Sequence, residues 1–63
     1  MSTFYIIMSR NGEFVAAGGG VRYTRFLNYA KHFTSLWSAE NFMKRKKLNV
    51  PVGYFFIKKI CHQ

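Results

Sequence analysis

The alternation of side-chain types over the first seventeen residues predicts a β-hairpin. Residues 3–9, TFYIIMS, are rich in β-branched and aromatic types and are predicted to form a strand. Asn11-Gly12 follows, a dipeptide that favours a two-residue type I′ turn because both residues tolerate positive φ. Residues 13–17 are then the return strand, with Arg10 opposite Glu13 as a weak surface ion pair. The same register pairs Ser9 with Phe14, Met8 with Val15 and Ile7 with Ala16.

Both faces of the predicted hairpin are apolar. In this register one face carries Phe4, Ile6 and Met8 together with Val15 and Ala17. The other face carries Tyr5 and Ile7 together with Phe14 and Ala16. A sheet with one wet face normally alternates apolar and polar residues, so the second face is expected to be covered, to stay open as an aromatic surface, or to form a homodimer. The alternation does not determine which face a helix would cover.

The only convincing helical period lies in residues 35–48, SLWSAENFMKRKKL. Three side chains could cap its start: Thr34, Ser35 and Ser38. At about 100° per residue, one apolar stripe collects Leu36, Ala39, Phe42 and Met43. Trp37 lies on the opposite side with Asn41, Lys44 and Leu48. Lys46 lies on the apolar side, where its stem would have to carry the ammonium out to solvent.

The segments on either side of this helix are less regular. The glycines at 18–20 predict a strand end or turn, since neither a GK[ST] motif nor a GxGxxG motif accompanies them. Residues 21–33 are predicted to be irregular, with alternation over 21–24 and one helical turn within 25–31. Pro51 predicts a turn over 49–53. Residues 54–60 then form a strand, with Phe55 and Ile57 on one face and Tyr54 and Phe56 on the other, before a frayed tail over 61–63.

These elements predict a single α+β domain spanning residues 1–63. An antiparallel sheet of three to four strands, made from the N-terminal hairpin and the C-terminal strand, would pack against one α-helix. The order of elements is ββ(β)αβ. With 49% hydrophobic and 19% aromatic residues, the composition can fill a core that is otherwise marginal in a chain of 63 residues.

The charge balance points to an anionic partner. Ten Lys and Arg residues stand against two acids, for a net charge of +8. Such an excess favours nucleic acid first and an anionic membrane second.

The residues give little support for catalysis. Cys61 is the single cysteine, which excludes an intrachain disulfide and is typical of a reducing cytoplasm. Cys61, His62 and His32 lack the spacing of a metal site, and Glu13 and Glu40 fall on different elements. His32 is expected to be a packed or surface residue. Because no apolar run suits a signal peptide or a bilayer span, we expect a cytoplasmic protein without membrane contact, enzymatic activity, metal or cofactor.

The run AKHFTSLWSAENFMKRKKL resembles a pattern found in small bacteriophage and prophage proteins of unknown function that open with a Y-x-I strand and an N-G turn. A looser form resembles the AP2-like arm-binding domains of phage integrases and the hybrid-binding domain of ribonuclease H. The matching positions are Phe33, Ser35, Ala39, Glu40 and Phe42. This resemblance implies a ββ(β)αβ module of phage origin, acting in the host cytoplasm, and in the two domain families the partner is nucleic acid.

Two functional hypotheses follow. In the first, a small basic accessory protein binds DNA or RNA through salt-sensitive phosphate contacts and stacked aromatics. In the second, a phage protein binds and inhibits or redirects a host protein, with Trp37 at the interface. The candidate contact residues are Arg22, Arg25, Lys31, Trp37, Lys44, Arg45, Lys47, Lys58 and Lys59. The candidate stacking residues are Tyr5, Phe14, Tyr54 and Phe56. Homo-oligomerisation is compatible with both.

Overall fold

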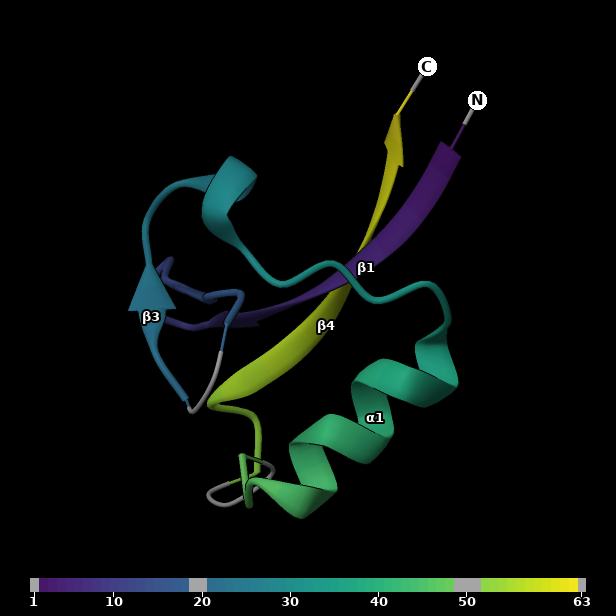
Figure 1. Cartoon of the computed structure of the whole chain (residues 1–63). Coiled ribbons are helices and arrows are strands. Elements are labelled where there is room, and N and C mark those ends of the chain that lie inside the picture. The colour runs from purple at the N-terminus through teal and green to yellow at the C-terminus, as the bar shows by residue number, and fades with distance from the viewer. Residues whose placement is uncertain (1, 19–20, 49–51, 63) are drawn as a thin grey trace.

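Strand β1 (Ser2–Ser9) lies inside an antiparallel sheet whose strand order is β3-β2-β1-β4 (Figure 1). The computed structural model describes residues 2–18, 21–48 and 52–62. The other strands are β2 (Phe14–Val15), β3 (Tyr23–Thr24) and β4 (Phe55–His62). Helix α1 (Leu36–Arg45) packs on β1 and β4, and a 3-10 turn, η1 (Leu27–Tyr29), precedes it. The predicted α+β class, the single helix and the ββ(β)αβ order are therefore confirmed.

The register of the hairpin differs from the prediction by one residue. Met8 pairs with Phe14, and the amide of Ser9 donates to the carbonyl of Glu13 at 2.7 Å. The loop therefore has three residues and closes with a hydrogen bond from the Gly12 amide to the Ser9 carbonyl at 3.0 Å. Gly12 has a φ of +83°, whereas Asn11 is not in the positive region, so the type I′ turn was wrong. Glu13 faces Ser9, not Arg10.

This shift decides which side chains share a face, because side chains alternate along a strand. Val15 joins Ile7 in the main core, where the two are 1% and 0% exposed. The prediction had grouped Val15 with Ile6 and Met8. Buried Ser9 explains the longer loop, since its hydroxyl also accepts a hydrogen bond from the Glu13 amide at 3.2 Å.

An irregular segment, residues 29–33, covers the edge where β1 and β2 separate. Phe33 exchanges two backbone hydrogen bonds of 2.8 Å with Tyr5. Further along, the Lys31 amide donates to the Val15 carbonyl at 2.8 Å, and Ala30 forms a bridge with Ala16. Residues 29–33 therefore connect β1 and β2 and fix the start of α1 over the sheet.

Helix α1 begins with a serine cap and ends earlier than predicted. The Ser35 side chain accepts a hydrogen bond from the Ser38 amide at 3.1 Å, which satisfies one free donor of the first turn. At the other end, the Leu48 amide donates to the Met43 carbonyl at 2.8 Å and the Lys47 amide to the Lys44 carbonyl at 3.2 Å. This is a Schellman ending, with Lys47 at φ +57° in the position that glycine normally occupies.

The early helix end changes the composition of the core. Leu48 lies outside the helix and is only 6% exposed, so it packs in the core and does not share a helical face with Trp37. Leu36, predicted to be in the core, is 47% exposed. Ala39 and Phe42 are buried as predicted, and Met43 packs partly against them. Lys46 is the exposed C-cap residue of α1, so its stem does not run along the apolar side of the helix as predicted.

Strand β4 pairs with β1 along its full length, from Ser9 opposite Phe55 to Ser2 opposite His62. The predicted fraying of residues 61 and 62 was wrong, because Cys61 pairs with Thr3 and His62 with Ser2, and β1 and β4 run side by side there (Figure 1). Ile57 lies opposite Ile7 and Phe56 opposite Met8, so the predicted faces of this strand are confirmed. Residues 19–20, 49–51 and 63, which include parts of two predicted turns and of the tail, lie outside the described residues.

Candidate functional site

The four consecutive cations after Met43 separate around the end of α1. Lys44 lines a groove on the β4 side of the helix. Arg45 is one position further along the helix, about 100° round from Lys44, and so lies toward the other flank. Lys46 and Lys47 form the helix ending itself, and all four side chains are exposed.

Lys31 adds a cation to the second flank of the helix. Its ammonium nitrogen lies 5.8 Å from the centroid of the Phe33 ring and 5.7 Å from that of Phe42. Phe42 is one helical turn before Lys46, whose amide donates to the Phe42 carbonyl at 3.0 Å. The cations on this flank therefore run from the helix end to the segment before the helix.

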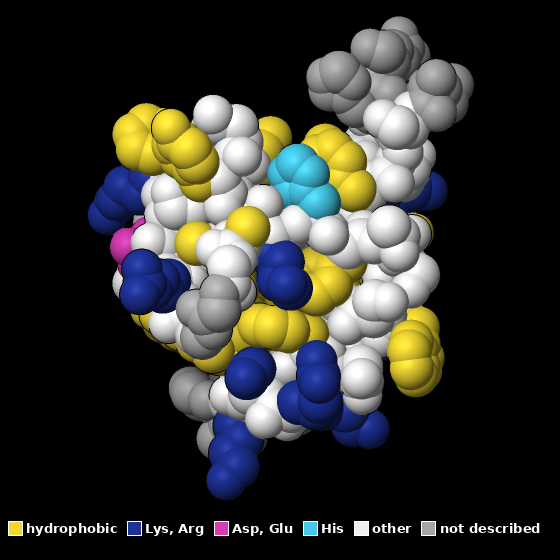
Figure 2. Space-filling model, in the orientation of Figure 1, with side chains coloured by type: hydrophobic (Ala, Val, Ile, Leu, Met, Phe, Trp, Pro, Cys, Tyr) yellow, Lys and Arg dark blue, Asp and Glu magenta, His cyan; other side chains and the backbone are white. Residues whose placement is uncertain are grey.

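We call this set the basic track, and it consists of Lys31, Arg45, Lys46 and Lys47. Figure 2 shows dark blue side chains gathered over the C-terminal end of α1, and another near the centre, over the segment that leads into α1. Magenta is visible only at the left margin of this face. A polyanion could therefore follow this surface with little repulsion.

An exposed aromatic pair lies just before the track along the chain. Phe26 and Tyr29 are 63% and 62% exposed, and their rings meet edge to face with centroids 6.0 Å apart. Phe26 is the N-cap of η1 and Tyr29 is its last residue, and this single turn is too short to bury two large rings. Arg25, also exposed, precedes Phe26, and the Phe26 amide is held by the Thr24 hydroxyl at 3.2 Å. The pair thus presents two exposed rings on the segment between Arg25 and Lys31.

The four predicted stacking residues do not form one platform. Tyr5 lies on the helix face as part of the core surroundings, while Phe14 and Phe56 lie on the opposite face with Met8. Tyr54 is partly buried, and its hydroxyl accepts a hydrogen bond from the side-chain Nδ2 of Asn11 at 2.8 Å. Of the four side chains, only Phe56 is exposed, with 43% of its surface accessible to solvent.

The remaining predicted cations lie apart from the track. Lys58 and Lys59 are exposed, but they face opposite sides of β4, because Lys58 lies opposite Ile6 and Lys59 opposite Tyr5. Arg22 is exposed beside β3. The predicted contact residues therefore fall into at least three groups.

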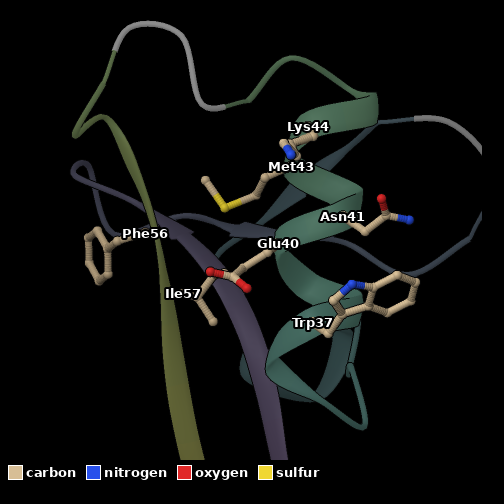
Figure 3. A pocket seen from close by; sticks show the side chains of 7 residues that line it. All are labelled: Trp37, Glu40, Asn41, Met43, Lys44, Phe56 and Ile57. Carbon is tan, nitrogen blue, oxygen red and sulfur yellow. The ribbon is translucent and has the colours of Figure 1, made fainter.

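A groove of about 480 Å³ lies between α1 and β4. Glu40 and Met43 reach from the helix toward β4, and Ile57 points back toward the helix (Figure 3). Trp37, 72% exposed, stands at one end of the groove and Lys44 at the other. Trp37 is therefore off the core stripe, as predicted, and available to a partner.

Sequence reasoning missed three residues of this surface. Phe26 and Tyr29 fell within the helical turn predicted over 25–31 and were given no contact role, and Lys46 was placed on the apolar side of the helix. The signal for the aromatic pair was the shortness of the segment between β3 and α1, where no long amphipathic element can bury both rings.

The polar groups that could support catalysis stay apart. His32 is exposed and stacks on Phe4 with ring centroids 4.0 Å apart, as expected for a surface histidine. Cys61 is a free, exposed thiol. Within residues 2–18, 21–48 and 52–62, no three metal-ligating side chains gather, and no helix is long and apolar enough to cross a bilayer.

Comparison with known proteins adds no family. No protein-family model, curated protein or solved structure matches the chain. The resemblance to phage proteins and to the two nucleic-acid-binding domains stays a prediction.

Proposed function

We propose that the protein binds single-stranded nucleic acid across the basic track and the exposed pair Phe26 and Tyr29. The observation that carries the proposal is that the segment with two exposed rings leads along the chain to Lys31, which lies against Phe42 of the helix that ends in the other cations of the track. Proteins that bind single strands combine a positive surface, which follows the phosphates, with aromatic rings on which bases stack.

The phosphate contacts supply most of the affinity in this account. The chain has a net charge of +8, and the cations of the track are carried by two separate elements held together through Phe42. Each phosphate neutralised on a single strand releases counterions, so affinity falls with added salt by about 0.7 in log units per contact for each tenfold rise in salt. Binding is therefore expected to be strongly salt-dependent.

The two rings favour a single strand over a duplex. Both rings are largely exposed, and stacking of an unpaired base on an aromatic side chain is worth roughly 1–3 kcal/mol. Bases inside a duplex are already stacked and present only their edges in the grooves. Stacking is therefore what distinguishes a single strand from a duplex, and it tolerates many base sequences.

The test is fluorescence anisotropy with labelled oligonucleotides of about 12 nucleotides, as single-stranded DNA, single-stranded RNA and duplex. We expect the single strands to bind more tightly than the duplex in ~50 mM salt, where phosphate contacts are strongest. Replacing Phe26 and Tyr29 by leucine should weaken single-strand binding and leave duplex binding unchanged. Absence of binding at this salt concentration contradicts the proposal.

A further inference from the structure

A second surface, separate from the basic track, lies on the other flank of α1 at the free edge of the sheet. β4 is the last strand in the order β3-β2-β1-β4, so among the residues that the structure describes no strand of the sheet neighbours the other side of its backbone. The groove beside it holds about 480 Å³ and is lined by Met43 and Ile57 with Trp37 at its end. An unpaired edge strand with an apolar groove beside it is the arrangement used by proteins that bind an extended peptide as an added strand.

The hydrogen-bond pattern shows which backbone groups of β4 are free. The Arg10 amide donates to the Tyr54 carbonyl at 2.9 Å, in the register that places Ser9 opposite Phe55. Because bonded and non-bonded pairs alternate in an antiparallel ladder, Phe56 and Lys58 bond to β1. Ile57 and Lys59 therefore direct their N–H and C=O groups away from β1, toward the free edge.

The side chains of these two residues lie on the helix face. Ile57 is opposite Ile7 of the core and lines the groove, and Lys59 follows two positions along on the same face. A residue paired with Ile57 on an added strand would lie about 5 Å away on this face, at the mouth of the groove. Residues paired with Lys58 and Lys59 would each lie next to an exposed ammonium group.

We infer that this edge binds an extended acidic segment of a partner protein as an additional antiparallel strand. Charge complementarity defines the segment: two consecutive acidic residues opposite Lys59 and Lys58, followed by a large apolar residue opposite Ile57. The apolar side chain enters the groove between α1 and β4, and the backbone groups of Ile57 and Lys59 pair with the added strand.

A second copy of this chain fits the edge less well than an acidic segment. Two β4 strands related by a two-fold axis at Lys58 or at Lys59 would place two ammonium groups directly opposite each other, which is destabilising, and in any register two chains of net charge +8 repel each other. The two acids of the chain, Glu13 and Glu40, lie outside the strands and cannot supply the paired carboxylates.

Nucleic acid fits this edge poorly as well. The free edge offers alternating donors and acceptors, which a peptide backbone matches and a row of phosphates does not. This inference is independent of the proposed nucleic-acid function, because it uses the other flank of α1.

The test is an amide-resolved NMR titration of the full chain with a capped peptide, Thr-Val-Glu-Glu-Phe-Val-Thr. We expect amide exchange to slow at Ile57 and Lys59 but not at Phe56 and Lys58, whose amides already bond to β1. This two-residue alternation is the signature of strand addition. Methylation of the peptide nitrogen of Phe, which would otherwise donate to Ile57, should weaken binding at least tenfold, and so should lysine in place of both glutamates.

Variants of the chain complete the test. Trp37→Ala should weaken peptide binding several-fold, as should Lys58→Gln with Lys59→Gln, whereas Arg45→Gln with Lys46→Gln should leave it unchanged. Four outcomes overturn the inference: no binding at millimolar peptide, equal binding of the methylated peptide, protection without alternation, or concentration-dependent protection of the same amides without peptide. The last outcome would assign the edge to a second copy of the chain.

Discussion

The ammonium nitrogen of Lys31 lies 5.7 Å from the ring centroid of Phe42, which links the segment before the helix to the helix itself. A cation over an aromatic ring is worth about 0.5–1 kcal/mol at an exposed site. We therefore expect Lys31→Met, which keeps the apolar stem, to lower the free energy of unfolding by about that amount in a urea titration. Lys31→Arg should retain the stability, and a methionine variant as stable as the parent would show that the ring contact contributes nothing.

The helix ending gives a second prediction. Lys47 is the only non-glycine residue with positive φ among the described residues, at +57°. The left-handed backbone conformation costs a residue with a side chain roughly 1–2 kcal/mol. Glycine avoids this cost but offsets part of the gain, because it loses more conformational entropy on folding. Lys47→Gly should therefore stabilise the protein by about 0.5–1 kcal/mol.

Lys46→Gly is the matched control, because Lys46 has an ordinary φ of −95° and loses the same charge. The stabilities of both glycine variants are compared by thermal unfolding, and we expect Lys46→Gly to be neutral or destabilising. Equal stabilisation by both glycines would mean that removal of a positive charge, and not the backbone conformation, is responsible.

The two leucines that bracket α1 test the revised core. Leu48 is 6% exposed and Leu36 is 47% exposed, the reverse of what helical periodicity alone suggests. Leu48→Ala should cost at least about 2 kcal/mol, as expected for a buried leucine. Leu36→Ala should cost less than about 1 kcal/mol. Similar losses in urea unfolding would contradict the helix ending described above.

The hairpin loop provides a fourth prediction. Gly12 has a φ of +83° while Asn11 does not lie in the positive region. Gly12→Ala should therefore destabilise the protein by roughly 1–2 kcal/mol, and Asn11→Ala by less than about 1 kcal/mol. A two-residue type I′ turn would strain both alanines equally. Equal losses of stability would therefore support the register predicted from the sequence and contradict the three-residue loop.

Local sequence predicted the elements more securely than their endings or register. Strand composition located β1 and β4, and Ser35 followed by the Ala39 and Phe42 spacing located α1. The register depended on the contacts of buried Ser9, which selects a three-residue loop although Asn-Gly favours two residues. The helix end depended on a lysine adopting the conformation that glycine normally takes.

The candidate site was predictable in composition but not in arrangement. The cations at 44–47 were evident, yet the split of Lys44 from Arg45 depends on where the helix lies against β4. The basic track also needs Lys31, which reaches Phe42 only because residues 29–33 pair with β1 and β2. Pairings between segments far apart in the chain have no local signature.

The most direct test of the nucleic-acid account compares two variants of equal charge. Arg45→Gln with Lys46→Gln removes two cations of the track, whereas Lys58→Gln with Lys59→Gln removes two from β4. The affinity for a single-stranded oligonucleotide is measured by anisotropy between ~50 and ~200 mM salt. The slope of log affinity against log salt concentration reports the number of phosphate contacts. We predict that the track variant loses about 0.7 in slope for each contact and that the β4 variant keeps the parent slope. Equal losses would mean that binding follows net charge alone, which would contradict the track.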